Sequence, residues 1–362
     1  MPLPPIAHIP SEWDQVLGII ETQAAQSDRD GVPRSHFDSL ASVGAHGEVS
    51  DPSMWRELTE RIAGADASTW FCWAQHQTPL RTLAAGGNQP SAVALQARWL
   101  PGMKNGSTLA AVAFAHIRRP GPANPVARNL NGSWQLTGTL DWVTSWDIAD
   151  VVMLMALTQD KSEIVTFFIP IVNFEEVISS SEVGEKLQLL SMSGTHTRPI
   201  RFADSVIPNE FLFSVTSYLE WQQGDQRKTI APNLAALGIA RSAIDELAEI
   251  GASRKSVSAT ELAESLSRRY LHLRAQAMDL IDQAGLAADS DLLETRVEIL
   301  ELARECATAV VIARAGASMQ VGSRAERRIR DSMFLQVQAQ TEITRNAALD
   351  HMNSAVNSSA LD

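Results

Sequence analysis

The stretch LNGSWQLTGTLDWVT, residues 130–144, decides how this chain is interpreted. Its centre, Trp134 to Leu140, is a short run rich in β-branched and aromatic residues. Asn131-Gly132 precedes this run, and Gly138 interrupts it. Glycine and asparagine bound strands at turns, so the stretch predicts a turn followed by a strand.

The segments on either side of this stretch also have the sequence pattern of short strands. They contain short apolar runs without helical periodicity, at residues 108–117, 151–158, 164–171 and 200–202. Several short strands bounded by turn residues are typical of a compact β-domain. We therefore expect a central β-domain over residues 106–215.

Helical patterns lie on both sides of this domain. Before it, apolar residues recur at helical spacing, and helices are predicted over residues 53–62 and 66–83 with Asp66 as an N-cap. After it, an apolar stripe runs over residues 230–247, and long segments with few breakers predict helices over 260–284, 292–319 and 325–352. The sequence thus predicts an N-terminal α-helical domain over 1–105 and a C-terminal helical bundle over 216–362.

Charge and composition exclude several classes of protein. The 362 residues carry a formal net charge of −12, and each predicted domain carries −4, so no clustered basic surface is expected to bind nucleic acid or a membrane. The start MPLPPIAHIP lacks the pattern of a signal peptide, and the longest apolar run, Val151 to Leu157, is too short to span a membrane. Cys72 and Cys306 cannot form a disulfide framework. We expect a cytoplasmic protein.

Four segments, in this order, resemble motifs of the acyl-CoA dehydrogenase superfamily. Residues 130–144 resemble its G-x-x-x-x-G-x-K-x-W-I-T hairpin, and residues 202–208 resemble the strand and turn that close its β-domain. Residues 237–247 resemble the first helix of its bundle, and residues 325–331 resemble its P-x-E-R-x-x-R-D stretch. The resemblance implies an α+β, mostly α fold, with an N-terminal helical domain, a central β-domain and a C-terminal four-helix bundle. It also implies a homodimer or homotetramer formed through the bundle.

The resemblance further implies a bound flavin, with FAD as the first choice and FMN as the alternative. Trp142 would pack against the isoalloxazine, and Thr144 would donate to flavin N5. Arg118 would lie beside the pyrimidine ring, and Arg254 with Ser256 would reach the FAD pyrophosphate of a neighbouring subunit. Each residue also has a structural interpretation: the Trp can pack beneath the β-domain, and the arginines can be solvated surface residues.

His76 is the candidate acid or base, because the resemblance places its helix against the substrate pocket. A structural histidine is the alternative. No pair of histidines has the spacing of metal ligands, so no metal site is expected.

The departures from the family bear on the reaction. Counting from Asp331, the family's catalytic Glu falls on Ala339, and a second known position of the base falls near Lys228. Abstraction of an α-proton needs a carboxylate within hydrogen-bond reach, and neither position supplies one. The sequence therefore predicts a flavin-dependent oxidoreductase acting on a small molecule, with an acyl-CoA thioester as one candidate. A flavin-dependent monooxygenase and a degenerate, non-catalytic member of the family are the alternatives.

Overall fold

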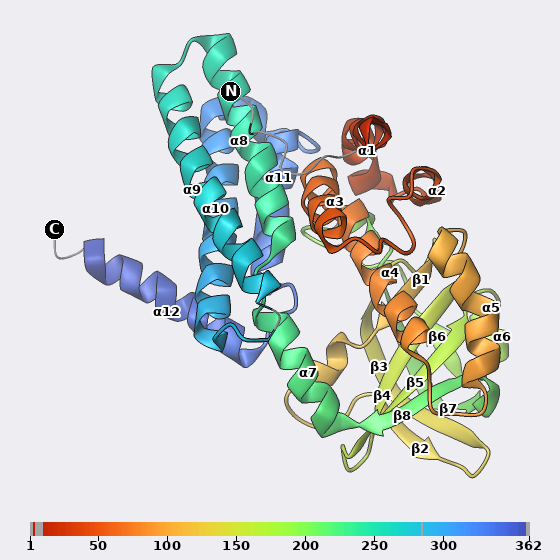
Figure 1. The fold of residues 1–362 in the computed structure, drawn as a ribbon. Coiled ribbons are helices and arrows are strands. Elements are labelled where there is room, and N and C mark those ends of the chain that lie inside the picture. The colour runs from red at the N-terminus through yellow and green to blue at the C-terminus, as the bar shows by residue number, and fades with distance from the viewer. Residues whose placement is uncertain (1–2, 4–9, 284, 360–362) are drawn as a thin grey trace. The chain divides into compact units, whose positions relative to one another are not determined.

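The computed structural model describes residues 3, 10–283 and 285–359 of the chain. It is mostly helical with one central sheet, which confirms the predicted α+β class (Figure 1). The longer helices are α1 (Ser11–Asp30), α2 (Arg34–Ser42), α3 (Pro52–Ala65), α4 (Ala67–Ala85), α5 (Ala92–Asn105), α7 (Tyr218–Ile230), α8 (Leu234–Arg254), α9 (Val257–Asp282), α10 (Asp289–Arg314), α11 (Arg324–Val337) and α12 (Glu342–Ser359). The strands are β1 (Ala110–Ala113), β2 (Val126–Asn129), β3 (Ser133–Val143), β4 (Val151–Thr158), β5 (Glu163–Pro170), β6 (Ser181–Val183), β7 (Arg198–Pro208) and β8 (Leu212–Ser217). Short helical turns are α6 (Phe174–Val177), η1 (Ala115–Arg118), η2 (Ser193–Thr195), η3 (Asn209–Phe211) and η4 (Ala315–Met319).

The chain forms two compact units, and each unit combines segments that are separated in the sequence. One contains residues 53–67 with residues 224–359, and is called the bundle unit here. The other contains residues 10–52 and 68–223, and is called the sheet unit. Helix α3 therefore packs with the C-terminal helices although it lies far from them in sequence. The three-domain division expected at residues 105 and 215 stays a prediction.

The sheet unit is built on a strand order of β6-β7-β3-β2-β4-β5-β8, with β1 pairing beside β4. Strand β4 runs parallel to β1 and β2 and antiparallel to β5. Its side chains alternate between two cores, as the two-residue period of a strand requires. Val152 and Leu154 face the core of β3 and β5, whereas Val151 and Met153 face the core that α4 and α5 complete. Both faces of this strand are covered, which explains its unbroken apolar sequence.

In the bundle unit, α8, α9, α10 and α11 pack side by side (Figure 1). Helix α3 joins them through buried acidic residues. Glu60 accepts hydrogen bonds from Arg274 Nε at 2.9 Å and from the Tyr270 hydroxyl at 2.8 Å. Glu57 accepts from Arg274 at 3.1 Å and from Arg241 at 3.3 Å. Burial raises the pKa of Glu60, although Arg274 and Tyr270 oppose the rise. Such buried carboxylates are tolerated because their hydrogen bonds are satisfied.

Two glycines bring α3 and α8 into close contact. A Cβ added at Gly238 of α8 would lie 1.9 Å from the carbonyl oxygen of Glu60, and one added at Gly64 would lie 2.8 Å from the carbonyl oxygen of Gly238. Only residues without a side chain permit backbones to approach this closely.

Two predicted elements are corrected by the structure. The helix predicted over residues 325–352 is two helices, α11 and α12, because Ala339 adopts a left-handed φ of 54° between them. The strand predicted over 108–117 is only the four residues of β1, after which η1 turns the chain away. The helix predicted over 53–62 and the strand predicted over 151–158 are confirmed as α3 and β4.

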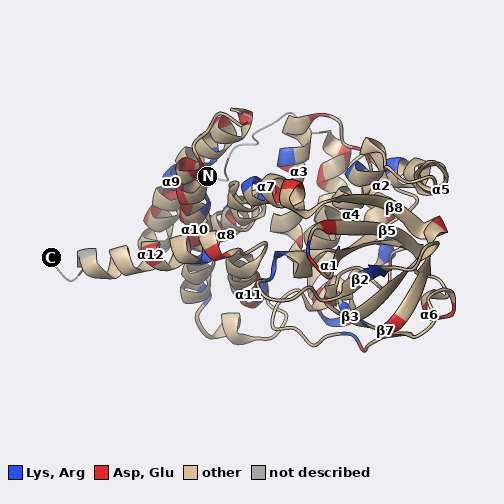
Figure 2. Ribbon diagram, turned by 90° about the horizontal axis from the view of Figure 1, so that it is seen from below, with Lys and Arg blue, Asp and Glu red and all other residues tan. Residues whose placement is uncertain are grey.

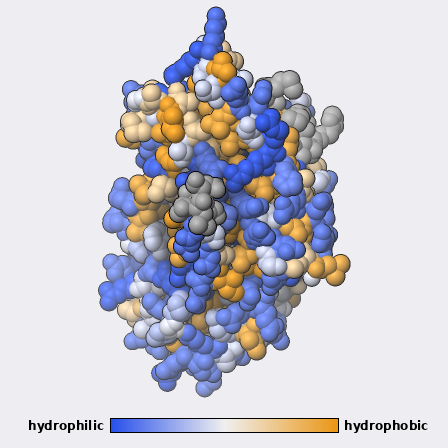
Figure 3. All heavy atoms as spheres, turned by 90° about the vertical axis from the view of Figure 1, so that its left-hand side faces the viewer, coloured by the Kyte–Doolittle hydropathy of each residue, from blue (hydrophilic) through white to orange (hydrophobic). Residues whose placement is uncertain are grey.

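The surface mixes charges of both signs. Basic and acidic segments lie close together along α9 and α10 (Figure 2). Large apolar side chains also remain exposed in the bundle unit, and apolar patches interrupt the polar surface in the view of Figure 3. They include Ile312, Leu349 and Val356, which are 73%, 58% and 65% exposed. Single exposed apolar side chains are normal on protein surfaces, and the predicted homo-oligomer stays a prediction. Among the described residues, no helix combines the length and apolar character needed to cross a membrane.

Candidate functional site

The end of β3 carries a half-exposed aromatic ring next to a buried hydroxyl. Trp142 is 49% exposed, whereas Val143 and Thr144 are buried. The alternation of a strand accounts for the difference between Trp142 and Val143, because successive side chains point to opposite faces. Thr144 follows the last residue of β3, and its buried hydroxyl faces that of Thr197. A large indole left in water at a strand end costs hydrophobic free energy, so a flat apolar group that covered it would be stabilised.

Three threonines form a chain of hydroxyl groups at this end of β3. The Oγ1 atoms of Thr144 and Thr197 are 3.4 Å apart, and those of Thr197 and Thr195 are 2.8 Å apart. The Thr195 hydroxyl donates to the Met192 carbonyl at 2.7 Å. This series of hydrogen-bonded hydroxyl groups ends at Thr144. Buried polar groups therefore orient the Thr144 side chain.

Backbone hydrogen bonds join the loop that carries Thr195 and Thr197 to the residues that follow β3. The Ser145 amide donates to the Thr195 carbonyl at 2.8 Å, and the Trp146 amide donates to the His196 carbonyl at 3.1 Å. Ser145, Met192 and His196 all have left-handed φ angles, of 68°, 61° and 51°. Non-glycine residues in this region are strained, and strain of this kind gathers at functional sites. The same corner leaves the buried Ser145 hydroxyl without a hydrogen-bond partner among the described residues.

The corner between α1 and α2 supports the same loop from the other side. The Val32 amide donates to the Gly194 carbonyl at 2.9 Å, and the His196 ring nitrogen Nε2 lies 2.9 Å from the Val32 carbonyl oxygen. The other ring nitrogen of His196 lies 3.2 Å from Asp147. A Cβ on Gly31 would lie 2.4 Å from the His196 ring, so only glycine fits there.

Arg118 lies on a segment tied to the same strand. The neighbouring Arg119 pairs with Asp141, the residue before Trp142. The guanidinium carbon of Arg118 stands 4.8 Å from the centre of the Phe114 ring, a cation–π contact. The structure therefore brings the predicted residues Trp142, Thr144 and Arg118 to adjoining segments of the sheet unit.

His76 is placed differently from the other predicted residues. It has no exposed surface, and its Nδ1 accepts a hydrogen bond from the Ala110 amide at 3.1 Å. Burial lowers its pKa to about 4, so the ring is neutral at pH 7. A general acid or base must reach the proton that it transfers. The placement favours the structural interpretation of this histidine.

The remaining predicted residues belong to the bundle unit. Arg254 ends α8, and its guanidinium donates to the Ala313 carbonyl at 2.7 Å. Ser256 is the N-cap of α9 and accepts from the Ala259 amide at 3.3 Å. Ala339 lies in the turn between α11 and α12. Arg254 and Ser256 thus share the turn between α8 and α9.

Sequence reasoning missed Thr195 and Thr197. They lie more than 50 residues from Thr144, and isolated threonines carry no pattern that marks them. The sequence Gly194-Thr195-His196-Thr197, with its buried hydroxyl groups beside a strained backbone, becomes informative only in three dimensions. Among the residues that the structure describes, no group of three or more His, Cys, Asp or Glu could hold a metal ion.

The architecture matches solved structures along nearly the whole chain, whereas no family model and no curated protein matches the sequence. Butyryl-CoA dehydrogenase from Megasphaera elsdenii aligns with a TM-score of 0.75 and 15% identity, over 96% of this chain and 99% of that chain. The chain has the acyl-CoA dehydrogenase fold. Other structures with this fold include a glutaryl-CoA dehydrogenase from Mycobacterium smegmatis in complex with FADH2, with a TM-score of 0.75 and 14% identity over 96% of this chain and 95% of that chain.

The acyl-CoA dehydrogenase fold is not confined to dehydrogenases. The dibenzothiophene monooxygenase of Paenibacillus sp. A11-2 aligns with a TM-score of 0.73 and 15% identity, over 93% of this chain and 95% of that chain. The fold alone therefore does not select between the two classes of reaction.

Proposed function

We propose that this chain is a flavin-dependent oxidoreductase acting on a small-molecule substrate. The observation that carries the proposal is the half-exposed Trp142 beside the Thr144 hydroxyl, at a strained corner of the sheet unit. The similar structures support it, since their names describe acyl-CoA dehydrogenases and a monooxygenase.

The residues at this corner fit a flavin. An isoalloxazine has a flat apolar face and a polar edge, and the Trp142 ring with the Thr144 hydroxyl offers a complement to each. Arg118, on the adjoining segment, would stabilise the negative charge of a reduced ring. When bound, the flavin would supply the capacity to accept and return two electrons, and these residues would hold and orient it.

FAD is our first choice of flavin and FMN the second. Arg254 and Ser256, at the turn between α8 and α9, supply a guanidinium and a hydroxyl that suit a phosphate group. This assignment and the homo-oligomer rest on the resemblance described above. His76 is left out of the proposed machinery because of its burial.

Flavin binding is tested by titrating the purified protein with FAD and FMN and recording absorbance and fluorescence. We expect Trp142→Ala to weaken binding about tenfold or more, and Trp142→Phe to retain it, because phenylalanine keeps an apolar plane. Thr144→Ala should shift the visible flavin band, whereas Thr137→Ala, on an exposed part of the same strand, should not. A protein that is colourless and takes up neither flavin would contradict the proposal and support a degenerate member of the fold.

The second candidate function is a monooxygenase, and Ala339 is the observation that favours it. A methyl group cannot remove a proton, so a base for α-proton abstraction is not supplied at this position. Anaerobic bleaching of the bound flavin by acyl-CoA thioesters would support a dehydrogenase. Substrate-dependent oxygen consumption with a flavin reductase, without bleaching by thioesters, would support the monooxygenase.

A further inference from the structure

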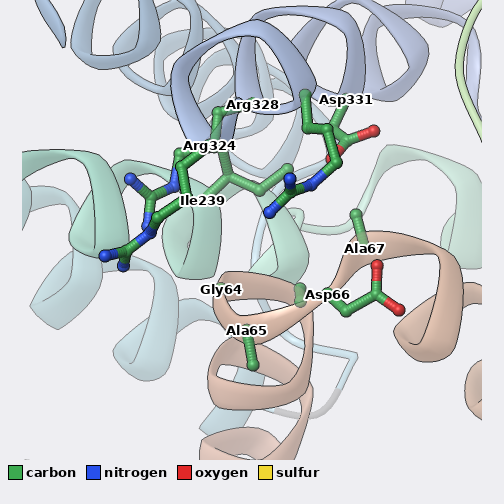
Figure 4. A pocket seen from close by; sticks show the side chains of 10 residues that line it. Gly64, Ala65, Asp66, Ala67, Ile239, Arg324, Arg328 and Asp331 are labelled. Carbon is green, nitrogen blue, oxygen red and sulfur yellow. The ribbon is translucent and has the colours of Figure 1, made fainter. Parts of the chain in front are cut away.

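A small pocket in the bundle unit lies between α11, α8 and the corner that joins α3 to α4 (Figure 4). Its cavity volume is only about 20 Å³, which is enough for one water molecule. Arginines of α11 that line it already have partners, since Arg328 pairs with Glu246 and Arg327 donates to the Gly322 carbonyl. The pocket is therefore too small for a ligand larger than water.

In the sheet unit, the His196 ring joins two segments that lie far apart in the sequence. Its Nε2 lies 2.9 Å from the Val32 carbonyl oxygen, at the corner between α1 and α2. Its Nδ1 lies 3.2 Å from the Asp147 carboxylate, in the turn that follows β3. The ring is largely enclosed, with 12% of the side chain exposed. His196 therefore contacts the α1–α2 corner and the turn after β3 at the same time.

The two contacts of His196 require a protonated ring if both are to be hydrogen bonds. A backbone carbonyl only accepts hydrogen bonds, and so does an ionised carboxylate. A neutral imidazole carries one N–H, so it can donate to Val32 or to Asp147 but not to both. Its other nitrogen would then direct a lone pair at an oxygen atom. The imidazolium form donates from both nitrogens, and its positive charge suits a carboxylate neighbour.

The charged groups around the ring share Asp147 between two donors. Arg198 of β7 donates to Asp147 through Nε at 2.7 Å. Arg34 of α2 is engaged elsewhere, since it pairs with Asp150 at 2.9 Å. Asp147 thus accepts from Arg198 and from His196, and loss of the His196 proton weakens the second contact. The remaining charged residues of the adjoining segments 28–34 and 184–187 are exposed or partly exposed, and they are Asp28, Arg29, Asp30, Glu185 and Lys186.

The ring stabilises a loop whose backbone is strained. Met192 and His196 have left-handed φ angles of 61° and 51°, which non-glycine residues keep only where their surroundings hold them. The ring also occupies the space that a Cβ on Gly31 would need, because that atom would lie 2.4 Å from the nearest ring atom. Packing this close leaves the ring little room to turn toward other partners. The contacts of the His196 ring therefore help to keep the loop in place.

We propose that protonated His196 is a positioning residue for the Thr144 hydroxyl, and that pH regulates the candidate site through it. Thr195 and Thr197 lie on either side of His196 and carry the hydroxyl groups that lead to Thr144. When the pH rises and His196 loses its proton, one of its two contacts is lost, the loop loosens, and the support of Thr144 weakens. The effect on a bound flavin rests on the proposed function, whereas the loosening of the loop does not.

Hydrogen exchange of the full chain without flavin tests the loosening. The reporters are the amides of Val32, Ser145 and Trp146, which donate to carbonyl groups of the loop. Their protection factors, corrected for the intrinsic pH dependence of exchange, are compared at about pH 6 and about pH 8, between which histidine changes its charge. We expect about tenfold less protection at the higher pH, because a hydrogen bond to a charged group is lost, and no change in the amides of β4. Reporter protection that does not change with pH would overturn the proposal.

Asp147→Asn is the informative variant. Its new amide group can donate to an unprotonated Nδ1 while Nε2 donates to Val32, so a neutral ring satisfies both contacts. We expect the pH dependence of the reporter amides to disappear in this variant and also in His196→Gln, which removes the titrating ring. The matched control is His272→Gln, which removes an exposed histidine of α9 and should keep the profile of the parent protein. An unaltered pH dependence in folded His196→Gln protein would refute the assignment.

Titration with FAD at the same two pH values tests the consequence for the site. We expect the affinity of the parent protein for FAD to fall about threefold or more at the higher pH, and the affinity of Asp147→Asn to be the same at both. Absence of FAD binding at either pH would contradict the proposed function, while the exchange profile still decides whether His196 holds the loop. Equal FAD affinity at both pH values, in a protein whose loop does loosen, would rule out the positioning role.

Discussion

Replacing Gly238 by alanine should destabilise the bundle unit, because α8 and α3 meet there backbone to backbone. The new Cβ would stand 1.9 Å from the carbonyl oxygen of Glu60 and 2.7 Å from its carbonyl carbon. Neither atom belongs to a side chain that could rotate away, so the two helices must separate. Overpacking of this kind costs about 1–3 kcal/mol, and the clash with backbone favours the upper end. Alanine regains about 1 kcal/mol of helix propensity, which leaves a net loss of about 2 kcal/mol.

The loss is measured by urea unfolding followed by circular dichroism, together with hydrogen exchange to locate it. Exchange should accelerate in α3 and α8, where separation also weakens the pairing of Glu60 with Arg274. The control is Gly18→Ala in α1, where no atom lies within 4 Å of the added Cβ. That variant should gain up to about 1 kcal/mol. The reasoning is refuted if Gly238→Ala is as stable as the parent protein, or if the faster exchange occurs in other helices.

Two further predictions concern the turn at Ala339 and a buried histidine. Ala339→Gly should stabilise the protein by about 0.5–1 kcal/mol, because glycine adopts the left-handed φ of 54° without strain. The control Ala347→Gly, inside α12, should lower the stability by about 1 kcal/mol. A lower melting temperature for Ala339→Gly would contradict this reasoning. His46 is buried against His76 with both ring nitrogens lacking a hydrogen-bond partner among the described residues, and burial lowers its pKa well below the usual 6.5. The unfolded chain then binds a proton that the folded chain does not, so stability is full above about pH 6.5 and falls as the pH drops below it. His46→Leu should reduce the loss of unfolding free energy between pH 7 and pH 5 by about 2 kcal/mol, and an unchanged pH profile would count against this origin.

The parts of the fold that follow from local sequence were predictable, and the parts that depend on distant contacts were not. Strand β4 occupies the predicted residues 151–158, because its apolar run has turns on both sides. The break in the predicted helix 325–352 has no local signal of glycine or proline. It is fixed by remote groups, since Arg296 donates to the Gln338 carbonyl at 3.0 Å and Asn233 donates to the Gln338 side chain at 3.2 Å.

The same distinction applies to the candidate site. Trp142 and Thr144 could be proposed from the sequence because both lie in one contiguous motif, residues 130–144. The hydroxyl groups that orient Thr144 belong to Thr195 and Thr197, in the loop that directly precedes β7. Only folding brings this loop next to Thr144. The role expected for His76 rested on its helix alone, whereas burial depends on what packs around that helix.

The resemblance assigns the family's catalytic Glu to position 339, in the turn between α11 and α12. Its backbone is held through Gln338, by Arg296 and Asn233, and the side chain at position 339 takes no part in those bonds. The fold therefore does not require a particular side chain there, so an alanine at this position is compatible with an intact bundle. On that resemblance, oxidation of an acyl-CoA thioester would need a base from another residue, because alanine cannot accept a proton. The monooxygenase proposal does not call on a base at position 339, and the thioester bleaching experiment separates the two proposals.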